Sequence, residues 1–333
     1  MSGCKFDGTL LKKLAYAVAL LSLALGAAPR ALANCGSAFC TVNTNWDTHG
    51  AWADPGFRLD LRYERIDQNQ PLAGRRKVAV GEFPRDHDEV RTSNRNWLVS
   101  LDYTFNADWS ASMALPVVSR DHFHIMNDFD NGTQTPEAWK FDKIGDMRVM
   151  LRRRLATFEA REPSLATVGL NMGLKLPTGS TNVVNAEGER AERTLQPGTG
   201  TTDVLLGAYY ARLLPVRDLS WFAQGLLQLP LNENEAYRPG RRISLDAGLR
   251  YDAAERLSLM LQLNALFRGR DSGANAERDD TGGRSWFLSP GLSFALTKDV
   301  RLYGFIQAPL YQYVNGVQLG SRPGAVMGVS ARF

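Results

Sequence analysis

Strict alternation of apolar and polar residues, repeated in segments of about ten residues, is the feature that most limits how this chain can fold. Between residues 56 and 66, Phe57, Leu59 and Leu61 alternate with charged side chains. A period of two places the apolar groups on one face of a β-strand and the charges on the other. Eleven further segments repeat the pattern, strongly or weakly: residues 97–105, 109–117, 147–155, 168–176, 203–214, 220–229, 243–251, 257–267, 285–296, 300–310 and 323–333.

The connections between these segments alternate in length. Short links are residues 106–108, 156–164, 215–219, 253–256 and 297–299, and long polar links are residues 67–94, 119–142, 177–202, 230–242, 268–284 and 311–322. Short turns at one end and long loops at the other are typical of bacterial outer-membrane barrels, whose tilted strands need about 9–11 residues to cross the bilayer. Residues 56–333 are therefore predicted to form an all-β, transmembrane, antiparallel up-and-down β-barrel of about 12 strands.

Aromatic residues separate this prediction from a soluble β-sandwich, which also alternates. If odd-numbered segments run outward, two aromatic bands flank an aliphatic belt, as expected at the two membrane interfaces. The predicted periplasmic band holds Phe105, Trp109, Trp221, Tyr251 and Phe333, and the predicted outer band holds Trp97, Phe267 and Trp286.

The first 33 residues have the composition of a cleaved signal peptide. Lys5, Lys12 and Lys13 precede an apolar run of about 15 residues, too short to cross a hydrocarbon core of roughly 30 Å. Ala31-Leu32-Ala33 matches the small-x-small cleavage pattern. Its removal lowers the net charge from +4 to about +1, so the charge gives no support for nucleic-acid binding. Export to the outer membrane of a Gram-negative bacterium is predicted, with a lipoprotein acylated at Cys35 as the alternative.

Residues 34–55 precede the first predicted strand and show no period. Cys35 and Cys40 are the cysteines left after signal cleavage, and a pair in an exported chain is expected to form a disulfide. This segment either folds into the barrel as a small plug or extends into the periplasm, where a redox or other periplasmic partner could act on it. The sequence leaves both arrangements open.

Two motifs flank the long link at residues 177–202. Lys175-Leu176-Pro177-Thr178-Gly179 ends one predicted strand, and Gln196-Pro197-Gly198-Thr199-Gly200 comes just before Asp203. These motifs resemble an outer-membrane "transporter" family, the phenol-degradation-pathway channel group, in which K-x-P-T-G ends a strand and Q-x-G-x-G-x-x-D leads into the next. The resemblance covers about thirty residues and implies a small monomeric barrel that passes or binds small, often hydrophobic molecules. It assigns these residues to a motif loop: Pro177, Thr178, Gly179, Gln196, Gly198, Gly200 and Asp203.

The face opposite the apolar belt is predicted to point into the lumen. Its charged members are Arg58, Asp60, Arg62, Glu64, Asp102, Asp146, Arg148, Arg152, Arg154, Lys175, Asp246 and Arg250. Charges away from water must pair, so they form either a salt-bridged filling or the lining of an aqueous path. Arg148, Arg152 and Arg154 form either an anion-attracting row or a row paired with carboxylates of the neighbouring strands.

The sequence gives little support for a metal site or for enzymatic activity. His122 and His124 would share a face on a strand and could hold a metal ion with a nearby carboxylate, but a solvated outer loop is the favoured interpretation. No G-x-S-x-G motif, phosphate-binding loop or dinucleotide fingerprint occurs. We expect no catalytic residue, no resident metal and no cofactor.

The sequence thus predicts a non-enzymatic, porin-like channel for passive passage of small molecules. The alternative is a filled structural barrel without an open pore, which acts through its outer loops or through residues 34–55. The expected partners are outer-membrane lipid, a small solute and the barrel-assembly machinery, which would read the terminal Phe333 and the alternating segment before it.

Overall fold

A computed structural model of the 333-residue chain describes residues 42–44, 55–160, 164–214 and 218–333. The predicted signal peptide and the two cysteines Cys35 and Cys40 lie outside the described residues. A short 3₁₀ turn, η2 (Arg278–Asp280), is the one helical element in the described part of the chain. No helix in those residues is long and apolar enough to cross a membrane.

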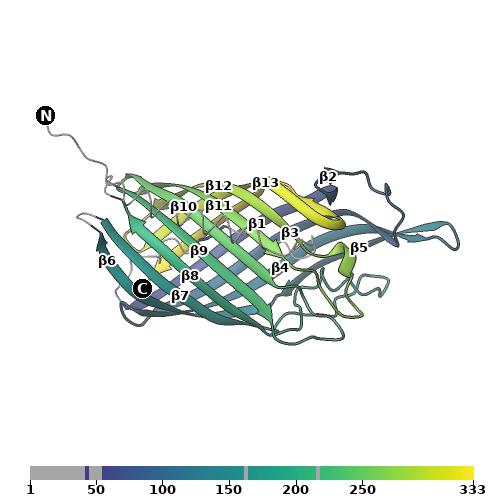
Figure 1. The fold of residues 1–333 in the computed structure, drawn as a ribbon, viewed down its shortest axis with the longest axis horizontal. Coiled ribbons are helices and arrows are strands. Elements are labelled where there is room, and N and C mark those ends of the chain that lie inside the picture. Colours follow the sequence, from purple (N-terminus) through teal and green to yellow (C-terminus); the bar gives the residue numbers. More distant parts are fainter. Residues whose placement is uncertain (1–41, 45–54, 161–163, 215–217) are drawn as a thin grey trace, which may run out of the picture. The chain divides into compact units, whose positions relative to one another are not determined.

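Twelve strands form one closed antiparallel sheet, which Figure 1 shows as a barrel of tilted strands. They are β1 (Gly56–Gly74), β3 (His87–Thr104), β4 (Trp109–Asp128), β6 (Met147–Ala160), β7 (Ser164–Leu176), β8 (Asp203–Leu213), β9 (Leu219–Pro230), β10 (Arg242–Ala254), β11 (Leu257–Arg268), β12 (Gly283–Ala295), β13 (Val300–Ser321) and β14 (Gly324–Arg332). Two shorter strands extend the ladder: β2 (Arg76–Lys77) pairs with β1, and β5 (Thr133–Ile144) pairs with β4.

Pairing of the last strand with the first closes the barrel. The β1–β14 register runs from Arg58 opposite Arg332 to Arg65 opposite Ala325. Beyond it, Phe57 and Phe333 exchange backbone hydrogen bonds of 2.9 and 3.2 Å. Closure removes the open edges that a flat sheet would leave unpaired, so each of the twelve barrel strands has a hydrogen-bonded neighbour on both sides. The predicted fold class is confirmed.

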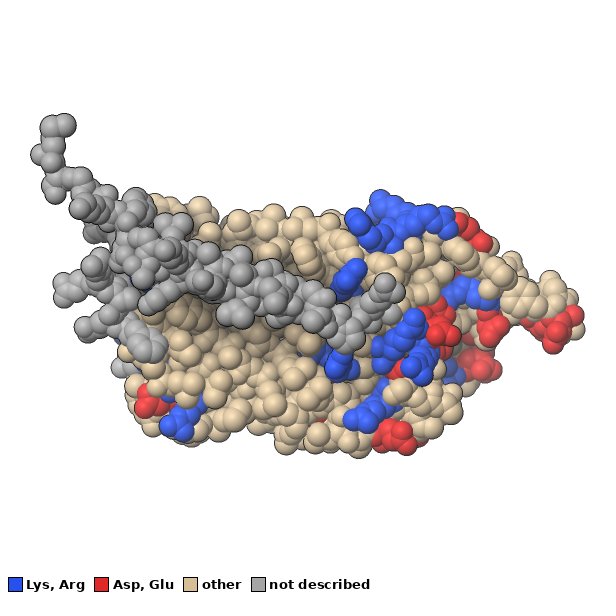
Figure 2. Space-filling model, in the orientation of Figure 1, with Lys and Arg blue, Asp and Glu red and all other residues tan. Residues whose placement is uncertain are grey.

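The alternation sorts side chains between the two faces of the barrel wall. In β11, Leu259, Leu261 and Leu263 are more than 40% exposed, whereas Gln262 and Asn264 are almost completely buried. This arrangement is the reverse of that in a soluble protein, where large apolar side chains are inside. On the face shown in Figure 2, charged side chains gather mainly toward the end that carries β5, and the middle of the barrel shows a broad uncharged surface.

Strands extend into three of the predicted loops, and the predicted boundaries were wrong there. β1 reaches Gly74 and β3 begins at His87, β4 and β5 cover most of residues 119–142, and β13 continues to Ser321. Hydrogen-bonded pairing needs only a neighbouring strand, so the ladder continues past the apolar belt with polar side chains on both faces. Loops at residues 177–202, 230–242 and 268–284 lie close to their predicted positions. We call the end of the barrel that carries these loops and β5 the long-loop end, and the opposite end the short-turn end.

Candidate functional site

Two neighbouring cavities lie inside the barrel and share three arginines. Arg62 of β1, Arg148 of β6 and Arg242 of β10 line both cavities, which have volumes of about 220 and 170 Å³. All three residues occupy inward-facing positions of their strands. The alternating pattern predicted this for Arg62 and Arg148, whereas Arg242 precedes the segment in which the alternation is clear. The shared arginines form the candidate site.

Cations outnumber carboxylates around both cavities. The larger one is lined by Arg62, Arg148, Arg152 and Arg242 against Asp102 and Asp246. The smaller one, toward the long-loop end, is lined by Arg62, Arg148, Lys175, Arg193, Arg242 and Arg268 against Asp146. The side chain of neither Arg148 nor Arg242 forms an ion pair or hydrogen bond in the described part of the chain. The surplus of positive charge makes the junction of the cavities attractive to anions.

All twelve predicted lumen residues occupy inward-facing positions. Arg58, Asp60, Glu64, Asp146, Lys175 and Asp246 are buried, and Arg62, Asp102, Arg148 and Arg152 line the larger cavity. Arg154 lines a small pocket with Asp102 and Arg152. Arg250 donates hydrogen bonds to Asp252 and Ser258 near the short-turn end.

Several of these charges pair with one another. Arg58 lies 2.8 Å from Asp102 on the neighbouring β3, and Arg62 lies 2.7 Å from Glu64 on its own strand. The Tyr303 hydroxyl donates to the Asp60 carboxylate at 2.9 Å. Part of the inner face is therefore a paired network that includes Arg62, whereas the side chains of Arg148 and Arg242 have no carboxylate within ion-pair distance in the described part of the chain.

The motif residues around the 177–202 loop meet in a second buried network. The Lys175 ammonium lies 3.0 Å from Asp146 and 3.2 Å from Asp203. Asp146 also accepts from the backbone N–H of Gly179 at 3.1 Å and of Thr199 at 2.9 Å. Both ends of the loop are therefore held by one carboxylate next to one lysine, which gives the two motifs a shared structural role.

The two motif glycines allow the loop ends to touch. A Cβ atom on Gly198 would overlap the backbone of Gly179, and one on Gly179 would overlap the backbone of Gly198 and Gly145. Thr178 completes the contact: its hydroxyl accepts from the Met147 N–H at 2.8 Å and donates to the Gly145 carbonyl at 3.0 Å. Only glycine permits so close a backbone approach.

The loop between the motifs is partly packed against the barrel, whereas residues 184–190 are mostly exposed. Val183, Ala191 and Leu195 are buried against Trp139 and Phe141 of β5. Gln196 spans the loop, accepting from Val183 N at 2.9 Å and donating to the Ala191 carbonyl at 2.7 Å. Residues 177–202 are rich in Gly, Thr and Glu and contain few apolar side chains. Those few pack the loop against β5, and Gln196 joins its two sides.

Three described residues of the N-terminal segment lie within the barrel. Gln262 of β11 holds the backbone of Asn43 from both sides, accepting from its N–H at 3.0 Å and donating to its carbonyl at 2.8 Å. Arg62 donates to the Thr44 hydroxyl at 3.0 Å, and Val42 is buried in an apolar cluster. All three residues line the larger cavity.

That apolar cluster was missed by sequence reasoning. It consists of Val42, Ile66, Phe222, Met260, Tyr303, Phe305 and Val326. Apart from Val42, its members lie on inward-facing positions of the strands, where apolar residues interrupt the polar face, so a mainly polar lumen was predicted. The face is in fact partly apolar, and it adjoins the larger cavity through Val42.

The two predicted histidines lie on a strand and not in a solvated loop. His122 and His124 are inward-facing residues of β4 and are 0% and 3% exposed. His122 Nδ1 lies 2.8 Å from the Thr92 hydroxyl, and His124 Nε2 lies 3.0 Å from Glu137 Oε2. The polar residues around them conceal the strand because β4 extends beyond the apolar belt.

Comparison with solved structures gives the same fold. An outer membrane channel from Pseudomonas putida F1 matches with a TM-score of 0.64 and 15% identity over 86% of this chain and 98% of that chain. The Pseudomonas putida toluene transporter TodX matches with a TM-score of 0.43 and 9% identity, over 84% and 91% of the two chains. The KdgM porin also has a TM-score of 0.43 and 9% identity, over 83% and 99%.

No family model and no curated protein matches the sequence. The likeness to the Pseudomonas putida F1 channel is one of fold. It agrees with the outer-membrane barrel expected from the two motifs.

Proposed function

We propose that the protein is a channel of the bacterial outer membrane that admits small organic molecules and favours those carrying a negative charge. The observation that carries the proposal is the pair of cavities inside a closed barrel, joined at Arg62, Arg148 and Arg242. Positive charge at a narrow point raises the local concentration of anions and lowers that of cations. The exposed leucines of strands such as β11 supply the surface that faces lipid.

The size and the walls of the site indicate the class of solute. A cavity of about 220 Å³ is somewhat larger than one of about 150 Å³ that encloses benzene. Leu98, Leu205 and Leu226 line it together with the arginines, and the apolar cluster around Tyr303 adjoins it. A small aromatic or aliphatic acid matches this combination, because its ring or chain contacts the leucines and its carboxylate contacts a guanidinium. The apolar part of such a solute agrees with the hydrophobic molecules implied by the sequence resemblance.

Residues 42–44 supply the constriction in this proposal. They line the larger cavity, and the contacts that hold them there include those with Gln262 and Arg62. A segment held by a few hydrogen bonds can leave and return without opening the barrel wall. The proposed channel is therefore narrow when the segment is seated and wider when it is released.

Single-channel recording in a planar bilayer tests this arrangement through Gln262→Leu. The substitution removes two hydrogen bonds to Asn43, worth about 1 kcal/mol each, so the released fraction rises by roughly thirtyfold. We expect small steps from the unchanged protein and more frequent large steps from the variant.

Gln68→Leu is the matched control, because Gln68 is equally buried and bonds Leu319 and Asn94, away from the segment. Large steps in both variants would mean a general loosening of the barrel. A silent barrel in all three proteins would favour the filled, structural alternative.

A further inference from the structure

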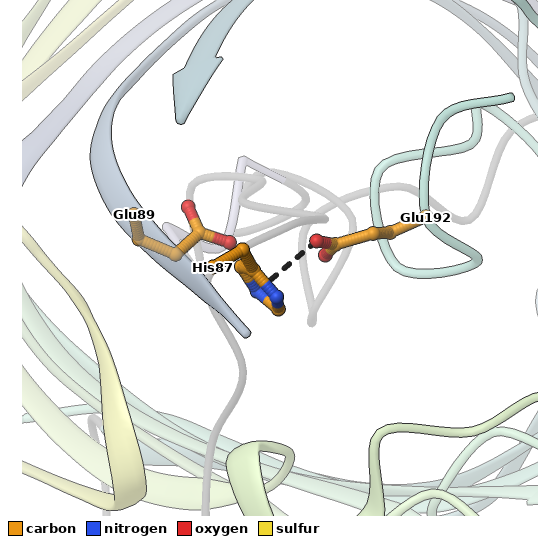
Figure 3. A group of neighbouring side chains, drawn as sticks. All are labelled: His87, Glu89 and Glu192. Atoms are coloured by element: carbon orange, nitrogen blue, oxygen red, sulfur yellow. Dashed lines mark ion pairs between the residues drawn. The ribbon is translucent and has the colours of Figure 1, made fainter. Parts of the chain in front are cut away.

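Histidine and glutamate side chains gather inside the long-loop end, apart from the cavities. His87 and Glu89 come from the first residues of β3, His124 comes from β4, and Glu192 comes from the 177–202 loop. Figure 3 shows His87, Glu89 and Glu192 pointing toward one another, with Glu192 reaching across from the loop. Three separate parts of the chain therefore contribute to one cluster.

The distances in the cluster are those of donor atoms around one small ion. One ligand atom each from His87, Glu89 and Glu192 lies within 4.8 Å of the others. His87 Nε2 is 3.1 Å from Glu192 Oε1, and His124 Nδ1 is 3.6 Å from the same oxygen. Ligands placed about 2.0–2.2 Å from a tetrahedral zinc ion are separated by similar distances.

The surroundings leave the carboxylates short of compensation. Glu89 Oε2 is buried and has no hydrogen-bond partner within the described residues, although His122 Nδ1 lies 3.7 Å from it. A buried carboxylate without a partner is costly, and a bound cation would remove that cost.

Glu137 orients the ring of His124 as carboxylates orient the histidine ligands of metal sites. His124 has its second ring nitrogen, Nε2, 3.0 Å from Glu137 Oε2. A carboxylate that accepts the other ring N–H directs the free nitrogen of a histidine toward a metal and increases its basicity. The Nδ1 atom of His124 is then the one that faces Glu192, at 3.6 Å, and it also lies 3.4 Å from His122 Nε2.

We propose that His87, Glu89 and Glu192, with His124 as the fourth ligand, bind a divalent transition-metal ion of the zinc type. Two imidazole nitrogens and two carboxylate oxygens suit zinc and its neighbours, whereas calcium takes six to eight oxygen ligands. The site is independent of the arginine-lined cavities and does not rest on the proposed passage of solutes.

Such an ion would fasten the loop to the barrel wall. Three of its ligands are on β3 and β4, which belong to the closed sheet, and the fourth is Glu192 of the loop. The loop is already packed through Leu195 and Ala191, so the ion adds a second attachment near its middle. Metal binding is therefore expected to slow proteolysis of residues 177–202.

The test is a zinc titration of the refolded, tag-free, chelator-treated protein, read by calorimetry and by X-ray absorption at the zinc edge. We expect one ion per chain, a first shell of nitrogen and oxygen only, and slower proteolysis of the loop. His87→Ala and Glu192→Gln should each weaken binding by at least about tenfold, the lower limit seen even for residues that only support ligands. Glu82→Gln, which changes an exposed carboxylate near His87 in sequence, should leave binding unchanged.

Heat-modified migration in detergent gels reports whether each variant keeps a folded barrel. Glu192→Gln lies outside the strands, so it tests the proposal even if His87→Ala fails to fold. Absence of stoichiometric binding would overturn the proposal. Equal binding by the unchanged protein and the folded Glu192→Gln variant would do the same.

Discussion

Replacing Lys175 with Met is expected to lower the free energy of unfolding by about 3–5 kcal/mol, because it leaves two buried carboxylates without their cation. Lys175 is 4% exposed and lies between Asp146 and Asp203, which are 6% and 1% exposed. Methionine has a similar volume but no charge, so both carboxylates would remain buried without their cation. Guanidinium unfolding of the barrel in phospholipid vesicles measures the change.

The same variant should also release the 177–202 loop, because Asp146 holds the Gly179 and Thr199 amides at the two loop ends. Limited proteolysis would then cut this loop faster than in the unchanged protein. Lys140→Met is the control: Lys140 is exposed on β5, and its loss should change stability by no more than about 0.5 kcal/mol. Equal stabilities for the Lys175 and Lys140 variants would show that the buried network does not hold the loop.

Reversing two lumen charges, in Arg148→Glu with Arg242→Glu, is expected to change the ion preference of the channel from anions to cations. Each reversal alters the energy of a monovalent ion about 4 Å away by roughly 2 kcal/mol even in a water-like medium. Because about 1.4 kcal/mol corresponds to a tenfold ratio, the chloride-to-potassium permeability ratio should fall by at least about tenfold. The reversal potential in a potassium chloride gradient measures this ratio.

Arg65→Glu with Arg95→Glu makes the same change in net charge on the outer surface. These two residues lie opposite each other in the β1–β3 register, and both are exposed. Their reversal should leave the permeability ratio nearly unchanged, because charges outside the wall are screened by salt. A shift of equal size in both double variants would place the selectivity outside the lumen.

The strand content of this fold can be predicted from residue order because lipid and lumen impose opposite demands on alternate side chains. That signal ends where lipid ends. Asp121 of β4 and Arg95 of β3 occupy outward positions beyond the apolar belt, so the sequence there reads as a polar loop although the strands continue. Pairing between backbones sets the strand length at this end, and pairing leaves no mark on composition.

The candidate site was only partly predictable for a similar reason. Parity places Arg148 on the inner face, but it does not show that Arg58 meets Asp102 while Arg148 has no ion pair in the described part of the chain. Which lumen charges form ion pairs depends on the register between neighbouring strands and on contacts between strands that are far apart in sequence. His87 and Glu192 are separated by about a hundred residues, and no local pattern brings them together.

Uptake of a small aromatic anion into liposomes tests the central claim most directly. Benzenesulfonate carries a permanent negative charge and crosses lipid poorly, and phenyltrimethylammonium is a cation of similar size. Vesicles containing the protein are predicted to take up benzenesulfonate well above the protein-free rate, and phenyltrimethylammonium at least about tenfold more slowly. Uptake of neither solute above the protein-free rate, by protein shown to be folded and inserted, would contradict the channel.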